Sequence, residues 1–251
     1  MNAASDDETR AHRARSFGRL AADYDRIRPG YPAAAIAALP GGPVVDVGAG
    51  TGKLTRALVA AGHRVVAVEP DPGMRAVLVG HDLPGVEVYD GVGERLPVPD
   101  GAAASVVYGQ AWHWVDPDAA SAEARRVLGP DGLLALLWNL PDLAVDWVAE
   151  LNRISGQPEP REHPEAPVLP GFGPPEVIDT RWSQELTPDE LVLLFSTFSR
   201  VSTREPADRQ SVLERLRDHL ARSPVTAGRA TLDYPYRCLT LLYRELAGKR
   251  T

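Results

Sequence analysis

The stretch Pro43-Val-Val-Asp-Val-Gly-Ala-Gly-Thr-Gly-Lys53 decides the fold that we expect for this chain. Val44, Val45 and Val47 form a short apolar run of the kind found in strands that are buried on both faces. The glycines that follow let the backbone bend sharply and lie against a ligand with no Cβ in the way. The stretch therefore predicts a buried parallel strand, a ligand-binding turn and then a helix.

A second apolar strand, expected over residues 65–68, ends in the acid Glu69. Glu69 lies about 20 residues beyond Gly48, where a carboxylate can accept hydrogen bonds from ribose hydroxyls. The unit is therefore predicted to bind an adenosine-type nucleoside. The alternatives are an ordinary strand-to-helix connection for the glycine turn and a solvated strand-end acid for Glu69.

The spacing of the glycines argues against a ligand that is held by its phosphates. A dinucleotide-binding fingerprint, G-x-G-x-x-G, needs a third glycine at position 53, which is Lys53 here. A P-loop, G-x-x-x-x-G-K-[ST], needs a glycine and a hydroxyl where the chain has Val47 and Leu54. A nucleotide-dependent oxidoreductase is therefore only a weak alternative.

Length, charge and cysteine content narrow the class of protein. A chain of 251 residues suits one domain with a full core, with or without a lid. The net charge of −7 opposes nucleic acid or an anionic membrane as partner, because phosphate binding needs a basic face. Without a signal peptide or an apolar run of spanning length, we expect a cytoplasmic protein. The lone Cys238 excludes an internal disulfide, and we expect no metal site.

The rest of the chain continues the alternation of strands and helices, which predicts parallel strands, right-handed crossovers and a ligand at the carboxyl ends of the strands. Up to residue 139, we expect strands over 86–89, 104–108 and 132–138, and helices over 54–61, 72–79 and 118–128. Beyond it, we expect helices over 143–154 and 206–222, a proline-rich loop over 158–175, a strand over 177–186, a helix starting at Thr187-Pro-Asp-Glu190, and closing antiparallel strands within 231–246.

Three stretches resemble a known family. Asp46-Val-Gly-Ala-Gly-Thr-Gly52 resembles the first motif of class I S-adenosylmethionine-dependent methyltransferases. The opening stretch 16–32 is similar to the N-terminal lid helix of the methyltransferase type 11 family, which is related to the ubiquinone/menaquinone methyltransferases. Gly109-Gln-Ala-Trp-His-Trp-Val-Asp116 resembles the motif after the fourth strand in a subgroup that includes trans-aconitate methyltransferase-like proteins.

This resemblance, which spans residues 16 to about 139, implies a fold and a reaction. The fold would be α/β and Rossmann-like, with a doubly wound, mostly parallel seven-stranded sheet, an N-terminal helical lid and C-terminal insertions. The division would be a lid over 1–40, an S-adenosylmethionine-binding core over 41–140, and substrate-side insertions with closing antiparallel strands over 141–251. The reaction would be methyl transfer from S-adenosylmethionine to a small-molecule acceptor.

The resemblance also assigns a cofactor site, made from the lid, the glycine turn, the acid after the second strand and the loop after the third. Its residues are Tyr24, Arg28, Asp46, Gly48, Ala49, Gly50, Gly52, Glu69, Pro70, Val92, Gly93, Glu94 and Gln110. The family loop often carries an Asp that accepts a hydrogen bond from the adenine amino group, and here that position is Val92. We therefore expect backbone around Val92 and Gly93 to read the adenine edge. A solvated loop charge is the alternative for Glu94.

The expected acceptor site surrounds the transferred methyl group. Its residues are Tyr31, Trp112, His113, Trp114 and Asn139, with His113 as the candidate general base. Aromatic faces would pack beside the sulfonium cation, and the planar fork of Arg28 suits the carboxylate of the cofactor. The alternatives are a lid whose aromatic residues only pack on the sheet, a structural histidine and a turn-forming Asn139.

The expected mechanism is direct in-line displacement in a dry pocket that holds the acceptor and the methyl group in near-attack geometry. A base is needed only where the acceptor must lose a proton. The alternative is a non-catalytic, cofactor-binding regulatory or partner subunit of the same fold. An acceptor-sized cavity lined by residues 110–114 would distinguish the two. The sequence indicates neither the acceptor nor the oligomeric state.

Overall fold

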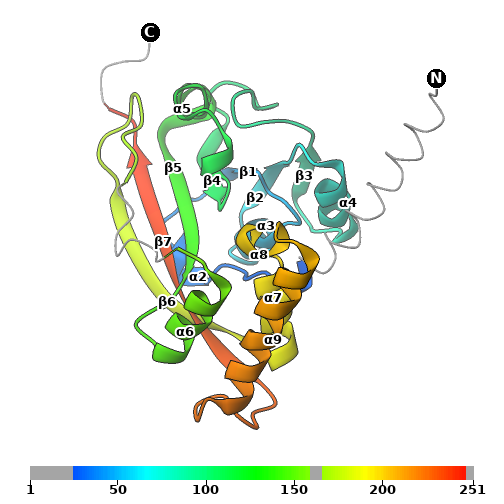
Figure 1. Cartoon of the computed structure of the whole chain (residues 1–251). Coiled ribbons are helices and arrows are strands. Elements are labelled where there is room, and N and C mark those ends of the chain that lie inside the picture. Colours follow the sequence, from blue (N-terminus) through cyan, green and yellow to red (C-terminus); the bar gives the residue numbers. More distant parts are fainter. Residues whose placement is uncertain (1–24, 159–165, 247–251) are drawn as a thin grey trace, which may run out of the picture.

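The computed structural model describes residues 25–158 and 166–246 and contains a seven-stranded sheet in the order β3-β2-β1-β4-β5-β7-β6 (Figure 1). The strands are β1 (Pro43–Val47), β2 (Arg64–Val68), β3 (Val86–Tyr89), β4 (Ala103–Gly109), β5 (Leu128–Pro141), β6 (Glu176–Leu186) and β7 (Leu232–Arg244). Neighbours among β1 to β5 are parallel, whereas β7 is antiparallel to both β5 and β6. The expected α/β, Rossmann-like sheet is confirmed.

Helices connect the strands, and some of them begin at a residue whose side chain caps the helix. The helices are α2 (Ala33–Ile36), α3 (Lys53–Ala60), α4 (Pro72–Gly80), the 3-10 turn η1 (Trp112–Trp114), α5 (Pro117–Val127), α6 (Asp146–Ser155), α7 (Pro188–Ser196), α8 (Ser199–Ser202) and α9 (Pro206–Arg222). Asp71 caps α4 by accepting a hydrogen bond from the Met74 N–H at 2.8 Å. Thr187 and Glu190 form a capping box at the start of α7, as their spacing predicts.

Alternate residues of the central strands face two different layers of helices. Val45 and Val47 belong to a buried cluster that includes residues of α5, whereas Val44 packs with residues of α2 and α3. The sheet is therefore covered on both faces, as its near-continuous apolar strands require. A further buried cluster joins α6, α7 and α9 to the ends of β6 and β7, and Figure 1 shows these helices close together.

The structure differs from the expected elements mainly in the second half of the sheet. β5 runs from Leu128 to Pro141 rather than over 132–138, because Leu128 pairs with Ala103 of β4 and β7 pairs with β5 from Leu133 to Pro141. The stretch 231–246 contains one long strand, β7, instead of several, since β6 supplies the other antiparallel strand. Of the expected proline-rich loop over 158–175, residues 159–165 lie outside the described part. Within the described ranges, no helix is long and apolar enough to span a membrane.

Candidate active site

A cavity of about 640 Å³ opens at the carboxyl ends of the parallel strands. Its walls are formed by the turn after β1, the residues after β2 and β3, and the segment after β4. They comprise Val47, Gly48, Gly50, Glu69, Pro70, Asp71, Met74, Gly91, Val92, Gly93, Glu94, Tyr108, Gly109, Gln110, Ala111, Trp114 and Val115. A cavity of this volume is the size of a small-molecule or cofactor site, which is roughly 300–1,000 Å³.

A second cavity of about 80 Å³ shares Gly48, Gly50, Gly109 and Gln110 with the first. It lies toward the N-terminal segment and is completed by Arg28, Pro29, Tyr31, Asp46, Ala49, Thr51, Lys53, Leu54 and Asn139. The two cavities therefore meet at the glycine turn and at the end of β4. A ligand that bound to both would cross this junction.

The glycine turn has a backbone that only glycine adopts readily. Gly48, Gly50 and Gly52 have φ angles of +67°, +59° and +89°. A Cβ at Gly48 would lie 2.5 Å from the Cβ of Ala111, and one at Gly52 would lie 2.4 Å from Cδ1 of Leu78. Gly50 has open space around its missing side chain, so its backbone is accessible to a ligand.

The carboxylate of Glu69 lies against this turn. Its Oε2 accepts a hydrogen bond from the Gly50 N–H at 2.8 Å, and its Oε1 accepts one from the Asp71 N–H at 2.8 Å. Burial raises the pKa of Glu69, and the two backbone donors oppose that rise. Each oxygen keeps a lone pair that can accept from a ribose hydroxyl. Because the Gly50 N–H already donates to this carboxylate, the turn is unsuited to binding a phosphate.

Asp46 is a buried acid with one unused oxygen. Its side chain is 1 % exposed, and Oδ2 accepts a hydrogen bond from the Thr55 hydroxyl at 2.6 Å. Its Oδ1 has no hydrogen-bond partner among the described residues. Burial raises the pKa of Asp46 to about 7. An unpaired buried acceptor on the wall of the smaller cavity fits a ligand that brings a donor, such as an ammonium group.

Gln110 forms part of the junction and has a strained backbone. Its φ of 60° is positive, which is uncommon for a residue other than glycine. The Gln110 N–H donates to the Leu137 carbonyl at 2.9 Å, and Nε2 donates to the Asn139 carbonyl at 2.9 Å. These bonds keep the backbone in a conformation of the kind that clusters at functional sites.

Two residues expected at the acceptor site, Tyr31 and Asn139, line the smaller cavity. The amide of Asn139 has protein partners: Nδ2 donates to the Gly30 carbonyl at 2.8 Å, and Oδ1 accepts from Trp182 Nε1 at 3.0 Å. It thereby joins the N-terminal segment to the sheet. Asn139, which we expected to orient the acceptor, thus also stabilises the fold.

Arg28 lines the smaller cavity and also contacts the C-terminal helices. Its Nη2 donates to the Thr197 carbonyl at 3.1 Å, and its guanidinium lies 4.8 Å from the centroid of the Phe198 ring. Tyr24, which we expected to act with Arg28 over the cofactor, lies outside the described residues. Phe17 of the expected lid lies outside them as well.

The loop after β3 forms one wall of the larger cavity through Val92, Gly93 and Glu94. Glu94 Oε1 accepts a hydrogen bond from the Asp116 N–H at 2.8 Å. A Cβ at Gly93 would lie 2.9 Å from the Tyr108 hydroxyl oxygen, so the loop packs closely on β4. Val92 offers the cavity no side-chain acceptor, which leaves the backbone to recognise a polar ligand edge.

The aromatic side chains of the motif after β4 point in different directions because this segment forms the 3-10 turn η1. Trp114 is 78 % exposed and lines the larger cavity, whereas Trp112 is 6 % exposed and packs edge-on against Tyr108. His113 is exposed, and neither cavity includes it or Trp112. Three residues per turn direct successive side chains about 120° apart, so neighbouring rings cannot all face one cavity. Of residues 110–114, the larger cavity includes Gln110, Ala111 and Trp114.

Several wall residues were not expected from the sequence. Asp71 and Met74 reach the larger cavity because α4 begins at Pro72, shortly after Glu69, and the Asp-Pro cap at its start was a usable signal. Lys53 and Thr51 reach the smaller cavity from the glycine turn itself. No local pattern distinguishes the last two residues from ordinary turn residues.

The chain is similar in sequence to known methyltransferases. A family model described as a methyltransferase domain matches residues 45–136. An uncharacterized methyltransferase of Mycobacterium bovis is 39% identical over 224 residues, which cover 88% of this chain and 92% of the relative. An uncharacterized methyltransferase of Schizosaccharomyces pombe is 28% identical over 243 residues, covering 91% and 96% of the two chains.

A solved structure from Anaeromyxobacter dehalogenans, described as a type II methyltransferase, shares the fold with a TM-score of 0.63 at 22% identity. The similarity covers 86% of this chain and 95% of that one. The glycine turn, the acid after β2 and the extent of the similarity to the mycobacterial relative lead to one assignment. This chain belongs to the methyltransferase family of these relatives.

Proposed function

We propose that this chain transfers the methyl group of S-adenosylmethionine to a small-molecule acceptor by direct in-line displacement. The family supplies the reaction class, methyl transfer. The choice of cofactor rests on one observation: Glu69 accepts a hydrogen bond from the Gly50 N–H on the wall of the 640 Å³ cavity. A carboxylate at this point favours ribose hydroxyls and repels a pyrophosphate.

The residues present fit the cofactor from end to end. Glu69 accepts from the ribose hydroxyls, and the backbone near Val92 and Gly93 meets the adenine edge. At the other end, the unpaired Oδ1 of Asp46 accepts from the amino group, and Arg28 faces the carboxylate. Asp46 and Arg28 are thus complementary to the two charges of an amino acid, and Lys53 is the third charged residue of the smaller cavity.

Gln110, which both cavities include, lies where the methyl-bearing sulfur is expected. The sulfonium supplies an activated methyl group when the cofactor is bound. The chain then has to orient the acceptor, exclude water and keep the reacting atoms in near-attack geometry. An acceptor such as a carboxylate or a neutral amine needs no base before it attacks, whereas a phenol or carbon acid does.

The N-terminal segment and the C-terminal half act as the lid and the substrate-side part of this domain in our proposal. Asp25 accepts hydrogen bonds from Arg56 Nη2 at 2.9 Å and Nη1 at 3.2 Å, which tie the segment to α3. Arg26 pairs with Glu190 of α7 at 2.9 Å. Ile27 is fully buried in the cluster formed with α6, α7 and α9. The segment thus connects the cofactor core to the helices of the insertion.

We further propose that the protein works in the cytoplasm, with neither nucleic acid nor a membrane as its partner. The net charge of −7 supports this, because a phosphate-rich partner needs a basic surface.

Two measurements test the proposed function. Calorimetric titration should detect binding of S-adenosylhomocysteine and none of NAD; binding of NAD with no response to S-adenosylhomocysteine would overturn the choice of cofactor. A turnover screen then offers S-adenosylmethionine with oxygen, nitrogen, sulfur and carbon acceptors and measures S-adenosylhomocysteine formation. Binding without turnover on any acceptor would instead favour a non-catalytic, cofactor-binding subunit.

A further inference from the structure

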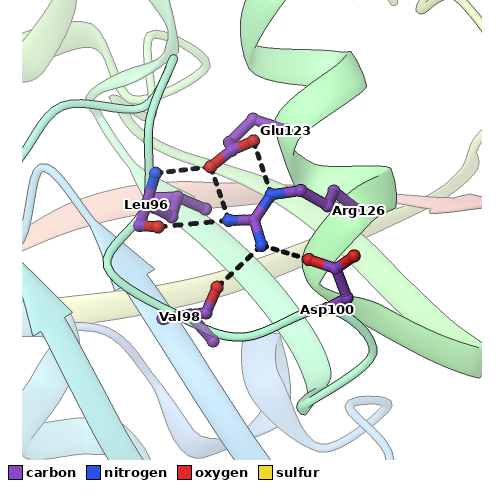
Figure 2. A network of polar contacts seen from close by, with 5 residues as sticks. All are labelled: Leu96, Val98, Asp100, Glu123 and Arg126. Atoms are coloured by element: carbon purple, nitrogen blue, oxygen red, sulfur yellow. Dashed lines mark hydrogen bonds and ion pairs between the residues drawn. The ribbon is translucent and has the colours of Figure 1, made fainter.

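Arg126, in the last turn of α5, makes five hydrogen bonds with its side chain (Figure 2). Nε and Nη2 donate to the two oxygens of Glu123 at 2.9 and 2.7 Å. Nη1 donates to the Val98 carbonyl at 2.9 Å and to Asp100 at 2.6 Å, and Nη2 also donates to the Leu96 carbonyl at 3.1 Å. A guanidinium has five N–H groups, so this one has as many bonds as donors.

Glu123 completes the network from the same helix. Its Oε1 accepts a hydrogen bond from the Leu96 N–H at 2.7 Å, in addition to the bond from Arg126. The contact with Arg126 lowers the pKa of Glu123, so the carboxylate is ionised at neutral pH. Both backbone groups of Leu96 are therefore bound to an ion pair on α5.

The loop held in this way continues directly from the wall of the larger cavity. The Arg95 N–H donates to the Val92 carbonyl at 3.1 Å and closes a tight turn around Gly93 and Glu94. Glu94 is bonded in turn to the N–H of Asp116, the cap residue of α5. One helix therefore holds the loop at two points, with Asp116 at its start and the Glu123–Arg126 pair near its end.

This double attachment matters because Val92, where the family loop often has an acid, offers the adenine amino group no side-chain acceptor. With Val92 in place of an acid, recognition of the adenine edge depends on backbone N–H and C=O groups, whose positions are set by the shape of the loop. The carbonyls of Leu96 and Val98 are already bound to Arg126, so the loop cannot reshape without breaking those bonds. Trp114, on another wall, lies in the turn that leads into the same helix.

We propose that Arg126, acting with Glu123, is a positioning residue that keeps loop 92–98 in the shape in which its backbone recognises the adenine of the cofactor. The inference rests on the proposed function, since it takes S-adenosylmethionine as the cofactor. Arg126 touches no wall of either cavity and acts through the loop. The planar fork of arginine is required, because a lysine cannot bond Glu123 and two carbonyls in these directions.

The experiment compares Arg126→Met and Arg126→Lys with a matched control, Arg153→Met. Arg153 also bonds a glutamate three residues earlier on a helix, with Nε to Glu150 at 2.7 Å, but its pair lies on the exposed face of α6. Calorimetry measures the Kd for S-adenosylhomocysteine and for S-inosylhomocysteine, in which an oxygen replaces the 6-amino group of adenine. Thermal unfolding is recorded for every variant.

The wild-type protein should bind the adenine compound in preference to the inosine analogue. Arg126→Met should weaken S-adenosylhomocysteine binding about tenfold, the cost of roughly one good hydrogen bond, and should weaken the analogue less. The preference for adenine therefore shrinks. Arg126→Lys should restore only part of the preference, and Arg153→Met should leave both constants unchanged.

A purely structural role would give a different result. Arg126→Met would then unfold at a lower temperature, yet retain both constants and their ratio at a temperature where it is folded, and that result would overturn the inference. If Arg126→Met does not fold, Glu123→Gln removes the charge at nearly constant volume and is judged by the same ratio. Failure of the wild-type protein to bind S-adenosylhomocysteine would instead contradict the proposed function.

Discussion

Oε2 of Glu69 accepts the Gly50 N–H at 2.8 Å, which joins the acid after β2 to the middle glycine of the turn after β1. β1 and β2 are parallel neighbours in which Val47 pairs with Val68, so the residues that follow them meet at one edge of the sheet. The acid therefore helps to set the shape of the turn and faces the same cavity as the turn. Replacement of this side chain should affect ligand binding before it affects the fold.

We expect Glu69→Ala to weaken S-adenosylhomocysteine binding about tenfold or more. Hydrogen bonds from hydroxyls to a charged acceptor contribute roughly 1.5–3 kcal/mol, and these bonds are lost with the carboxylate. Calorimetric titration checks the prediction, with Glu176→Ala on the exposed first residue of β6 as the control. An unchanged Kd in a folded Glu69→Ala variant would place the ribose elsewhere.

Asp46 should make the stability of the ligand-free protein depend on pH. Burial raises its pKa to about 7 in the folded state, against roughly 3.9 in an unfolded chain. The folded state thus favours the protonated acid. The stability that Asp46 contributes to the folded state is therefore fully present below about pH 4 and is lost as the pH rises to 7. The loss amounts to at most about 1.4 kcal/mol per pH unit.

Asp46→Asn removes the titration and keeps an acceptor for the Thr55 hydroxyl. Its melting temperature should exceed that of the wild-type protein by an amount that grows between pH 5 and pH 8. Thermal unfolding at several pH values, without cofactor, measures this difference. A difference that is constant over the range would show that Asp46 has no raised pKa.

Cofactor binding should also displace a proton from Asp46. The amino group of the cofactor is cationic and favours the ionised carboxylate, so binding should lower the pKa of Asp46 and release part of a proton near pH 6.5. Titrations of S-adenosylhomocysteine in two buffers with different ionisation enthalpies measure the release. The effect should vanish in Asp46→Asn. Equal proton release in that variant would assign it to another group.

Gly52 and Gly62 form a matched pair for testing the glycine turn. Both have a φ of +89°, but only at Gly52 would a Cβ meet a neighbour, Leu78 Cδ1 at 2.4 Å. Gly62→Ala should therefore cost about 1–2 kcal/mol, the strain of a left-handed backbone. Gly52→Ala should cost more in urea unfolding and should also weaken S-adenosylhomocysteine binding. Equal losses of stability would mean that Leu78 moves aside freely.

The parts of the fold that were predicted from the sequence are those that residues adjacent in the sequence determine. β3 and α9 have the expected bounds, since valine alternation and a proline start are visible in neighbouring residues. The lengths of β5 and β7 were not predictable, because each strand extends as far as its partner on the other side of a long insertion. The length of each strand in the closing part of the sheet therefore depends on the strand with which it pairs.

The same distinction holds for the site. Glycine spacing and the distance to Glu69 predicted that the glycine turn and the acid lie together, because parallel strands bring both to one edge. The three rings of residues 112–114 point in different directions because these residues form a 3-10 turn, which no residue type indicates. All three rings were therefore predicted from the sequence to lie at one site, whereas the structure separates them. The network around Arg126 was missed for another reason: it joins a helix to a loop about 30 residues earlier through backbone carbonyls, which leave no sequence pattern.

A general-base role for His113 stays a prediction, and the structure sets a condition for it. The ring is exposed beside Trp114, with centroids 4.7 Å apart, and lines neither cavity, so an acceptor must extend beyond the cavity walls to reach it. Desolvation by neighbouring groups lowers the pKa of His113, which leaves the ring neutral at pH 7 and able to accept a proton.

If the acceptor reaches this ring, His113→Ala should leave the Kd for S-adenosylhomocysteine nearly unchanged and lower the rate of methyl transfer by ~10²–10⁴. Because the neutral imidazole is the base, the wild-type rate should rise with pH through the lowered pKa of His113 and then level off, and the variant should lack that rise. His63→Ala, in the turn before β2, serves as the control. Normal turnover by His113→Ala at saturating acceptor, with an unaltered pH profile, would remove His113 from the active site.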